Sequence, residues 1–172
     1  MKGEPMCMEE KRYDVDAVRE WLDQYLETEK EIDDQIERLE RLESRMRGIS
    51  AQVLTGMPRS PSASTDRMAD MVGLKEELNL SIKEAVSQQS LKRIQIESVL
   101  KRSCKSEEKS VIRLRYIDRT EWNDVLDIMF GGKPDFLEKE ESYKRRMYRK
   151  HESAILNMAR YFQESNTAIP AT

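Results

Sequence analysis

The chain has 172 residues, of which 37% are charged and 38% hydrophobic, with six Gly, five Pro and 6% aromatic residues. Such charge density with few helix-breaking residues favours long solvated helices and argues against a large β or α/β enzyme core. The net charge of −3 provides no overall basic field, so a nucleic-acid surface would need local segregation of charge.

Residues that commonly build catalytic or metal centres are sparse. His151 is the only histidine, and Cys7 and Cys104 form no Cys-X-X-Cys pair. No nucleophile–base set or paired carboxylates stand out, so we expect no enzyme activity, no cofactor and no metal site. The sequence has no signal-peptide pattern and no run of about 18 apolar residues, so we expect a soluble cytoplasmic protein without membrane contact.

The first expected element is a long helix, preceded by a polar segment, residues 1–12, that we expect to be disordered. Asp14 or Asp16 can cap this helix, which runs to about Arg47. Glu29 and Glu43 occupy two positions of its apolar seam where an apolar residue would be expected, so we expect the packing along the seam to be moderately stable. The apolar residues recur at alternating steps of three and four and imply a supercoiled partner helix; they are Val15, Val18, Leu22, Tyr25, Ile32, Ile36, Leu39 and Met46.

A second long helix is expected from about Arg67 to Lys101, after a loop at residues 48–66 that contains Pro58 and Pro61. The two helices predict an antiparallel hairpin over residues 13–102. Because so long a helix must bury its apolar stripe, self-association as a homodimer is an alternative or an addition. The stripe comprises Met68, Met71, Leu74, Leu78, Ile82, Ala85, Ile96, Val99 and Leu100.

Residues 106–162 have the pattern of a helix-turn-helix, completing an all-α fold. Ser106 can cap a first helix, and Thr120 can cap a second over residues 122–130. Ser142 is expected to cap the last helix, after an acidic spacer of about eleven residues, 131–141. Residues 163–172 are expected to form a flexible tail.

The last helix begins with a strongly basic stretch, which holds five basic residues and no acidic one between Tyr143 and His151. Arginine binds phosphates or takes guanine bidentately, and tyrosine can reach the DNA backbone. We therefore predict a DNA-binding face formed by Lys144, Arg145, Arg146, Tyr148, Arg149 and Lys150. The alternative is a solvated face paired to Glu138, Glu140 and Glu141. His151 is expected to be packed or hydrogen-bonded rather than catalytic.

Two segments resemble region 4 of sigma-70-type factors: VIRLRYIDRTEWNDVLDIMFG (111–131) and YRKHESAILNM (148–158). The whole chain resembles ArpU/RinA-like late-transcription regulators of phages and prophages, in which a charged helical half and a loop like MPRSPSASTDRMAD (57–70) precede such a module. The resemblance implies a DNA-binding regulator of late genes in a bacterial host, with host RNA polymerase as a candidate partner. It places promoter contacts on the basic face, and structural support on Leu114, Trp122, Val125 and Ala154.

Two other functions fit the pattern. A phage small terminase subunit also joins a helix-turn-helix to oligomerising helices, and it would assemble as a ring. A coiled-coil adaptor would use the basic helix only as a solvated surface and would bind no DNA.

Overall fold

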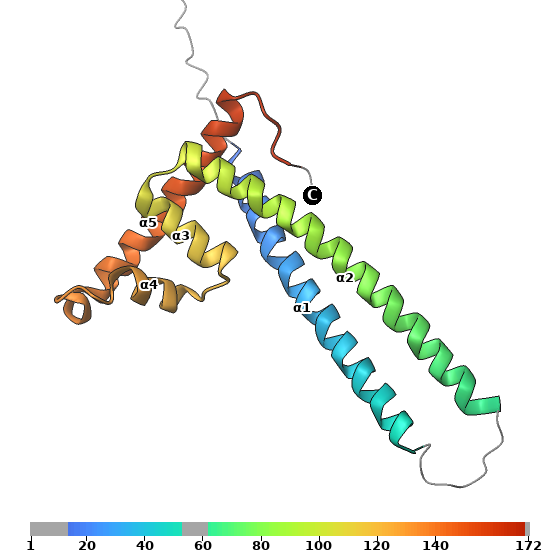
Figure 1. Ribbon diagram of the computed structural model, residues 1–172. Helices are drawn as coiled ribbons and strands as arrows, with labels where there is room; N and C mark the ends of the chain where they lie inside the picture. The colour runs from blue at the N-terminus through green and yellow to red at the C-terminus, as the bar shows by residue number, and fades with distance from the viewer. Residues whose placement is uncertain (1–13, 53–61, 171–172) are drawn as a thin grey trace, which may run out of the picture. The chain divides into compact units, whose positions relative to one another are not determined.

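The computed structural model describes residues 14–52 and 62–170. Every regular element in these residues is helical, which confirms the all-α fold and its long N-terminal helix pair (Figure 1). The elements are α1 (Val15–Gln52), α2 (Ser62–Ser103), α3 (Ser106–Ile112), the π-helical turn η2 (Arg113–Ile117), α4 (Trp122–Phe130) and α5 (Phe136–Glu164). The expected disorder at residues 1–12 and the centre of the expected loop lie outside the described residues. None of the described helices is long and apolar enough to cross a membrane.

The chain divides into two compact units, and the division does not fall at residues 103–105, where the sequence suggested a boundary. Unit 1 comprises Met1–Gln24 and Ile96–Thr172, and unit 2 comprises Tyr25–Gln95. The start of α1 belongs to unit 1 because its apolar side chains are buried there: the ring of Trp21 contacts that of Phe162 edge-on, with ring centroids 5.6 Å apart.

Unit 2 is a helical hairpin whose two helices are longer than expected. The expected stop at Gly48 is wrong, because α1 continues to Gln52 and a glycine inside a helix costs only about 1 kcal/mol. The expected start at Arg67 is also wrong, because α2 begins at Ser62. No Gly or Pro lies between residues 62 and 66, so nothing in this stretch opposes the helix.

The seam between the helices of unit 2 is rotated from the expected one near the middle of α1. Ile36 is exposed, whereas Leu42 is buried. Glu43 lies beside the seam and pairs with Lys75 across it, Nζ to Oε1 2.7 Å. Leu74, expected in the stripe of α2, is also exposed. Other buried members of the seam are Tyr25, Leu26, Ile32, Leu78 and Gln89.

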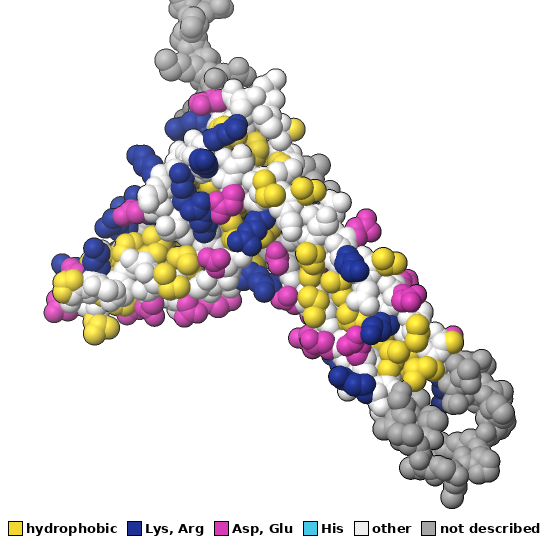
Figure 2. Space-filling model, viewed as in Figure 1, with side chains coloured by type: hydrophobic (Ala, Val, Ile, Leu, Met, Phe, Trp, Pro, Cys, Tyr) yellow, Lys and Arg dark blue, Asp and Glu magenta, His cyan; other side chains and the backbone are white. Residues whose placement is uncertain are grey.

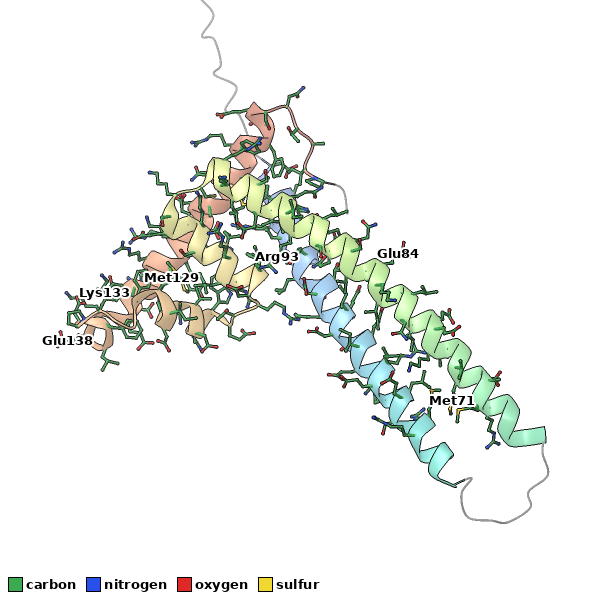
Figure 3. All side chains as sticks on the ribbon, viewed as in Figure 1. Met71, Glu84, Arg93, Met129, Lys133 and Glu138 are labelled. Carbon is green, nitrogen blue, oxygen red and sulfur yellow. The ribbon has the colours of Figure 1, made fainter. Side chains whose placement is uncertain are left out.

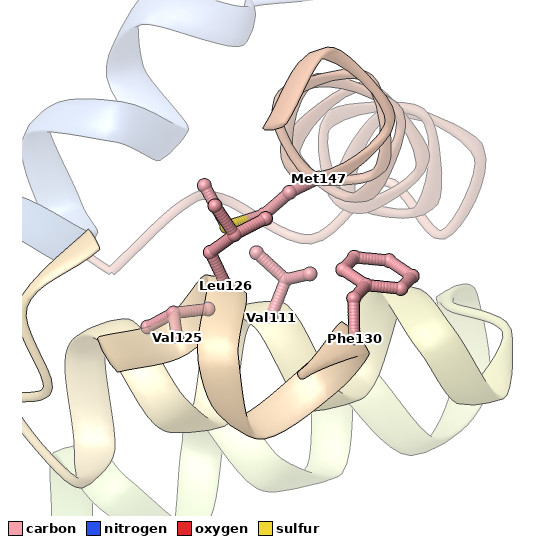
Figure 4. Packing of buried hydrophobic residues seen from close by; sticks show 5 residues of the cluster. All are labelled: Val111, Val125, Leu126, Phe130 and Met147. Carbon is pink, nitrogen blue, oxygen red and sulfur yellow. The ribbon is translucent and has the colours of Figure 1, made fainter. Parts of the chain in front are cut away.

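Unit 1 is built on a small apolar core shared by α3, α4 and α5. Val111, Val125, Leu126, Phe130 and Met147 are buried together (Figure 4). Leu114 and Trp122 pack against this cluster, as the sequence predicted for supporting residues, and Ala154 is fully buried.

The caps of α3 and α4 differ from the expected ones. Lys105, not Ser106, occupies the N-cap of α3, and Glu121, not Thr120, occupies that of α4. The backbone N–H of Lys105 donates to the carboxylate of Glu108 at 2.7 Å, so an acidic residue of the first turn satisfies this helix end.

The connection between α4 and α5 is short. It comprises the five residues between Phe130 and Phe136, so the expected spacer of about eleven residues and the expected cap at Ser142 are both wrong. Asp135, at the N-cap of α5, accepts hydrogen bonds from Lys139 at 2.9 Å and from the Tyr143 hydroxyl at 2.8 Å. The acidic stretch therefore forms the first turns of α5, with non-helical backbone angles at Lys139 (φ −121°, ψ 20°).

The end of α5 also extends past the expected boundary of the tail. The helix continues to Glu164, and the backbone N–H of Thr167 donates to the carbonyl of Phe162 at 3.1 Å. Residues 165–168 are exposed, whereas Ile169 and Pro170 are half-buried.

Candidate nucleic-acid interface

All six predicted DNA-binding residues lie on α5, within two consecutive turns. Arg145 and Arg149 are exposed and one turn apart. The Arg145 side chain is 76% exposed, and its ionic neighbour is Glu141 in the preceding turn, Nε to Oε1 3.6 Å. A shallow open depression on the helix surface is lined by Glu141, Ser142, Arg145, Tyr148 and Arg149. This arrangement leaves the two guanidinium groups accessible to a large anionic partner.

Arg146 and Lys150 differ from that pair because both contact α3. They bind the two oxygens of Glu107 at 2.7 Å and 3.0 Å. The hydrogen bond from Lys150 and the charge of Arg146 hold the pKa of Glu107 below its ordinary value. The Arg146 guanidinium also lies 5.5 Å from the centroid of the Phe130 ring. These two cations therefore help to position α5, and their charge is partly compensated within unit 1.

Tyr148 belongs to an aromatic cluster beside the basic face. Its ring centroid is 5.1 Å from that of Trp122, which contacts His151 edge-on at 5.0 Å. Arg115 lies over Trp122, 5.2 Å from the ring centroid. Lys144, the sixth predicted residue, is half-buried on the same helix.

Glu107 and Glu108 support α5, and the sequence reasoning missed this role. They were assigned only a favourable effect on the helix dipole, whereas Glu108 is 3% exposed and accepts hydrogen bonds from α5. Ser153 Oγ donates to it at 2.7 Å and Asn157 Nδ2 at 3.2 Å. Burial raises the pKa of Glu108, but these bonds and the one from the Lys105 N–H outweigh that effect and lower it.

The four α5 side chains that bind these two carboxylates recur at helical spacing along one side of α5. They are Arg146, Lys150, Ser153 and Asn157. The sequence does contain polar residues at this helical spacing on α5 and two adjacent glutamates on α3. This pattern could have indicated that polar contacts, as well as apolar packing, join α3 to α5.

His151 is buried and hydrogen-bonded, as predicted. Its Nε2 lies 3.1 Å from the Tyr116 hydroxyl, and its Nδ1 lies 3.6 Å from Glu152. Burial lowers the pKa of His151, and burial raises that of Tyr116 to about 12. Among the described residues, no group of three or more His, Cys, Asp or Glu side chains is arranged to hold a metal ion.

Charge is segregated over the surface of unit 1. Lys and Arg gather over α3 and along the edge formed by α5, whereas Asp and Glu gather along the edge formed by α4 (Figure 2). The exposed acidic residues of α4 and its cap are Glu121, Asp124 and Asp127. The basic side chains of unit 1 are therefore concentrated on α3 and α5, and the outer side of α4 is acidic.

Comparisons with family models, with curated proteins and with solved structures returned no match.

Proposed function

We propose that the protein is a sequence-specific regulator of transcription that binds double-stranded DNA through the outer face of α5. The observation that carries this proposal is the pair of accessible arginines on the part of α5 that follows the kink at Lys139, in a helix that begins five residues after α4. A second helix that follows the first after a few residues and presents a basic outer face is the arrangement with which helix-turn-helix proteins enter the major groove.

The chemistry of the basic face supports contacts of two kinds. Arg145 and Arg149 can reach base edges or phosphates, because a guanidinium binds guanine or phosphate bidentately. Arg146 and Lys150 lie one step around the helix toward α3, where they suit phosphates. Contacts to phosphate set the register of the helix, and contacts to base edges select the sequence.

The rigidity of the support also favours recognition. Glu107 and Glu108 bind α5 over about three turns, from Arg146 to Asn157. A recognition helix held in this way loses little conformational freedom on binding, so more of the interaction energy appears as affinity.

The acidic edge of α4 determines how the duplex approaches. Phosphates near Glu121, Asp124 and Asp127 would be repelled, so the duplex should lie against α5 with α4 turned away from it. The resemblance to phage late-transcription regulators adds late-gene promoters as the expected targets and RNA polymerase as a candidate partner.

The proposal is tested by capturing genomic fragments of a bacterium or prophage with the full chain, sequencing them, and measuring the affinity for the enriched site. We expect tight binding to one promoter-proximal site. The double variant Arg145→Ala/Arg149→Ala should lose at least about 30-fold in affinity, since each lost arginine contact costs about 1–3 kcal/mol.

The matched control is Arg41→Ala/Arg45→Ala, because these exposed arginines have the same spacing but lie on α1 in unit 2. This control should bind the site like the wild type. Absence of DNA binding at low salt would reject the proposal and leave the coiled-coil adaptor. Equal losses in the two double variants would reject α5 as the site.

A further inference from the structure

Glu107 lies between two cations of the proposed DNA-binding face. One of its carboxylate oxygens binds Arg146 Nη2 at 2.7 Å, and the other binds Lys150 Nζ at 3.0 Å. The two cations are one turn apart on α5, so their charged groups can meet on the same anion. This edge of α5 is therefore a site at which an arginine and a lysine together hold one anionic group.

The contact is open to solvent, unlike the one beside it. The side chains of Glu107, Arg146 and Lys150 are 43%, 44% and 32% exposed. The neighbouring Glu108 is buried and accepts hydrogen bonds from two other side chains of α5. An ion pair at the surface adds little to stability, because water screens both charges. The Glu107 carboxylate can therefore leave its cations while Glu108 and the apolar core keep α3 packed on α5.

A DNA phosphate resembles the group that Glu107 presents. A phosphodiester, like a carboxylate, offers two anionic oxygens, and both arginine and lysine bind it. Arg146 and Lys150 lie about 100° around α5 from Arg145 and Arg149. A helix in the major groove has phosphates on both sides, so a duplex that contacts the outer pair of arginines brings phosphates toward the second pair.

We propose that Arg146 and Lys150 form a phosphate-binding subsite, which the Glu107 carboxylate occupies in the free protein and a DNA phosphate takes over in the complex. The inference rests on the proposed binding of DNA through α5. Glu107 is then an internal competitor of DNA. It keeps both cations paired when no DNA is bound, and it lowers the affinity for every duplex that uses the subsite.

The exchange is tested without any substitution by NMR titration of the glutamate carboxyl groups in the full chain, with and without the DNA site enriched by capture. In the free chain, the hydrogen bond from Lys150 and the charge of Arg146 hold the pKa of Glu107 below its ordinary value. In the complex we expect the pKa of Glu107 to rise, and to rise by more than that of Glu108, which keeps its donors. An equal or smaller change at Glu107 would overturn the proposal.

The competition is tested by the affinity of the full chain for the same DNA. Glu107→Gln should bind about 3- to 30-fold more tightly than the wild type, because two surface ion pairs no longer compete. In the background Arg146→Gln/Lys150→Gln, the same substitution should lose this effect, since the subsite is gone. A gain of equal size in both backgrounds would indicate a general effect of charge, and no gain in either would exclude competition; each result contradicts the proposal.

Glu138→Gln is the matched control, because it makes the same change of charge on α5. Glu138 is exposed and lies at the end of unit 1 where Figure 3 also shows Lys133, eight residues before Arg146. Its effect on affinity should be the same with and without Arg146 and Lys150. A wild type that binds no captured DNA would reject the proposed function together with the exchange. DNA binding that Glu107→Gln leaves unchanged would reject the exchange alone.

Discussion

Glu108 is a buried negative charge that accepts hydrogen bonds from the backbone of Lys105 and from the side chains of Ser153 and Asn157. We expect Glu108→Ala to destabilise unit 1 by about 2–4 kcal/mol, because the donors of Ser153 and Asn157 lose their acceptor. Glu107→Ala is the control: it breaks ion pairs at the surface and should cost at most about 1 kcal/mol. Denaturant titration of both variants measures the difference, and equal losses would contradict the assignment.

His151 should make the stability of unit 1 depend on pH below the ordinary histidine pKa of 6.5. Burial holds the pKa of His151 below that value, so the unfolded chain binds the proton more readily than the folded chain. The free energy of unfolding therefore falls as the pH drops through 6.5 toward the lowered pKa. His151→Gln cannot titrate, and its Tm should be flatter than that of the wild type over this range. Parallel curves would show that another group is responsible.

Among the elements, the turn between α4 and α5 requires a residue without a side chain at position 131. A Cβ atom on Gly131 would lie 2.6 Å from the carbonyl oxygen of Asp127, which accepts the Gly131 N–H at 2.8 Å. We expect Gly131→Ala to cost about 1–3 kcal/mol by straining this end of α4.

Gly132→Ala provides a control one residue further along, because nothing lies within 4 Å of the corresponding Cβ position. It should change the free energy of unfolding by about 0.5 kcal/mol or less. Thermal unfolding compares the two variants, and a similar cost in both would show that the turn tolerates side chains.

The helices themselves could be predicted from the sequence, but their register and joints could not. Charge density and the apolar repeat predict a hairpin and three further helices, which the structure contains. The sequence did not decide whether Ile36 or Leu42 faces the partner helix. A helix turns by about 100° per residue, and an apolar seam shifted by one residue keeps the same period.

The joint before α5 was missed for another reason. Four acidic or basic residues in a row were taken for a loop, whereas Asp135 holds these turns by accepting hydrogen bonds from the side chains of Lys139 and Tyr143. The basic face itself followed from spacing along one helix. Arg146 and Lys150 differ from Arg145 and Arg149 because they bind Glu107. That contact depends on tertiary packing, which no local sequence pattern contains.

For the whole molecule, the proposed binding to DNA predicts a measurable dependence on salt. Each phosphate contact releases about 0.9 counterion, so the logarithm of the affinity falls linearly with the logarithm of the salt concentration. If Arg145 and Arg149 each neutralise one phosphate, the double alanine variant should have a slope smaller by about 2. If they contact only base edges, the slope should stay close to that of the wild type while specificity falls, which fluorescence anisotropy across salt concentrations would distinguish.

Unit 1 should not be stable without the start of α1. A fragment beginning at Ile96 lacks Val18, Trp21 and Leu22, which are buried in this unit, and it exposes the Phe162 ring. We expect such a fragment to melt well below the full chain, since the loss of several buried apolar side chains costs several kcal/mol. Calorimetry of the fragment and the full chain tests this, and equal melting temperatures would contradict it.

The same discontinuity has a consequence for synthesis on the ribosome. Unit 2 is one contiguous stretch, so all of its residues are available as soon as Gln95 has left the exit tunnel. The apolar side chains at the start of α1 must wait until α5 has been translated about 140 residues later. During this interval Trp21 has no ring to pack against, which makes the nascent chain a client for chaperones that bind exposed aromatic and aliphatic side chains.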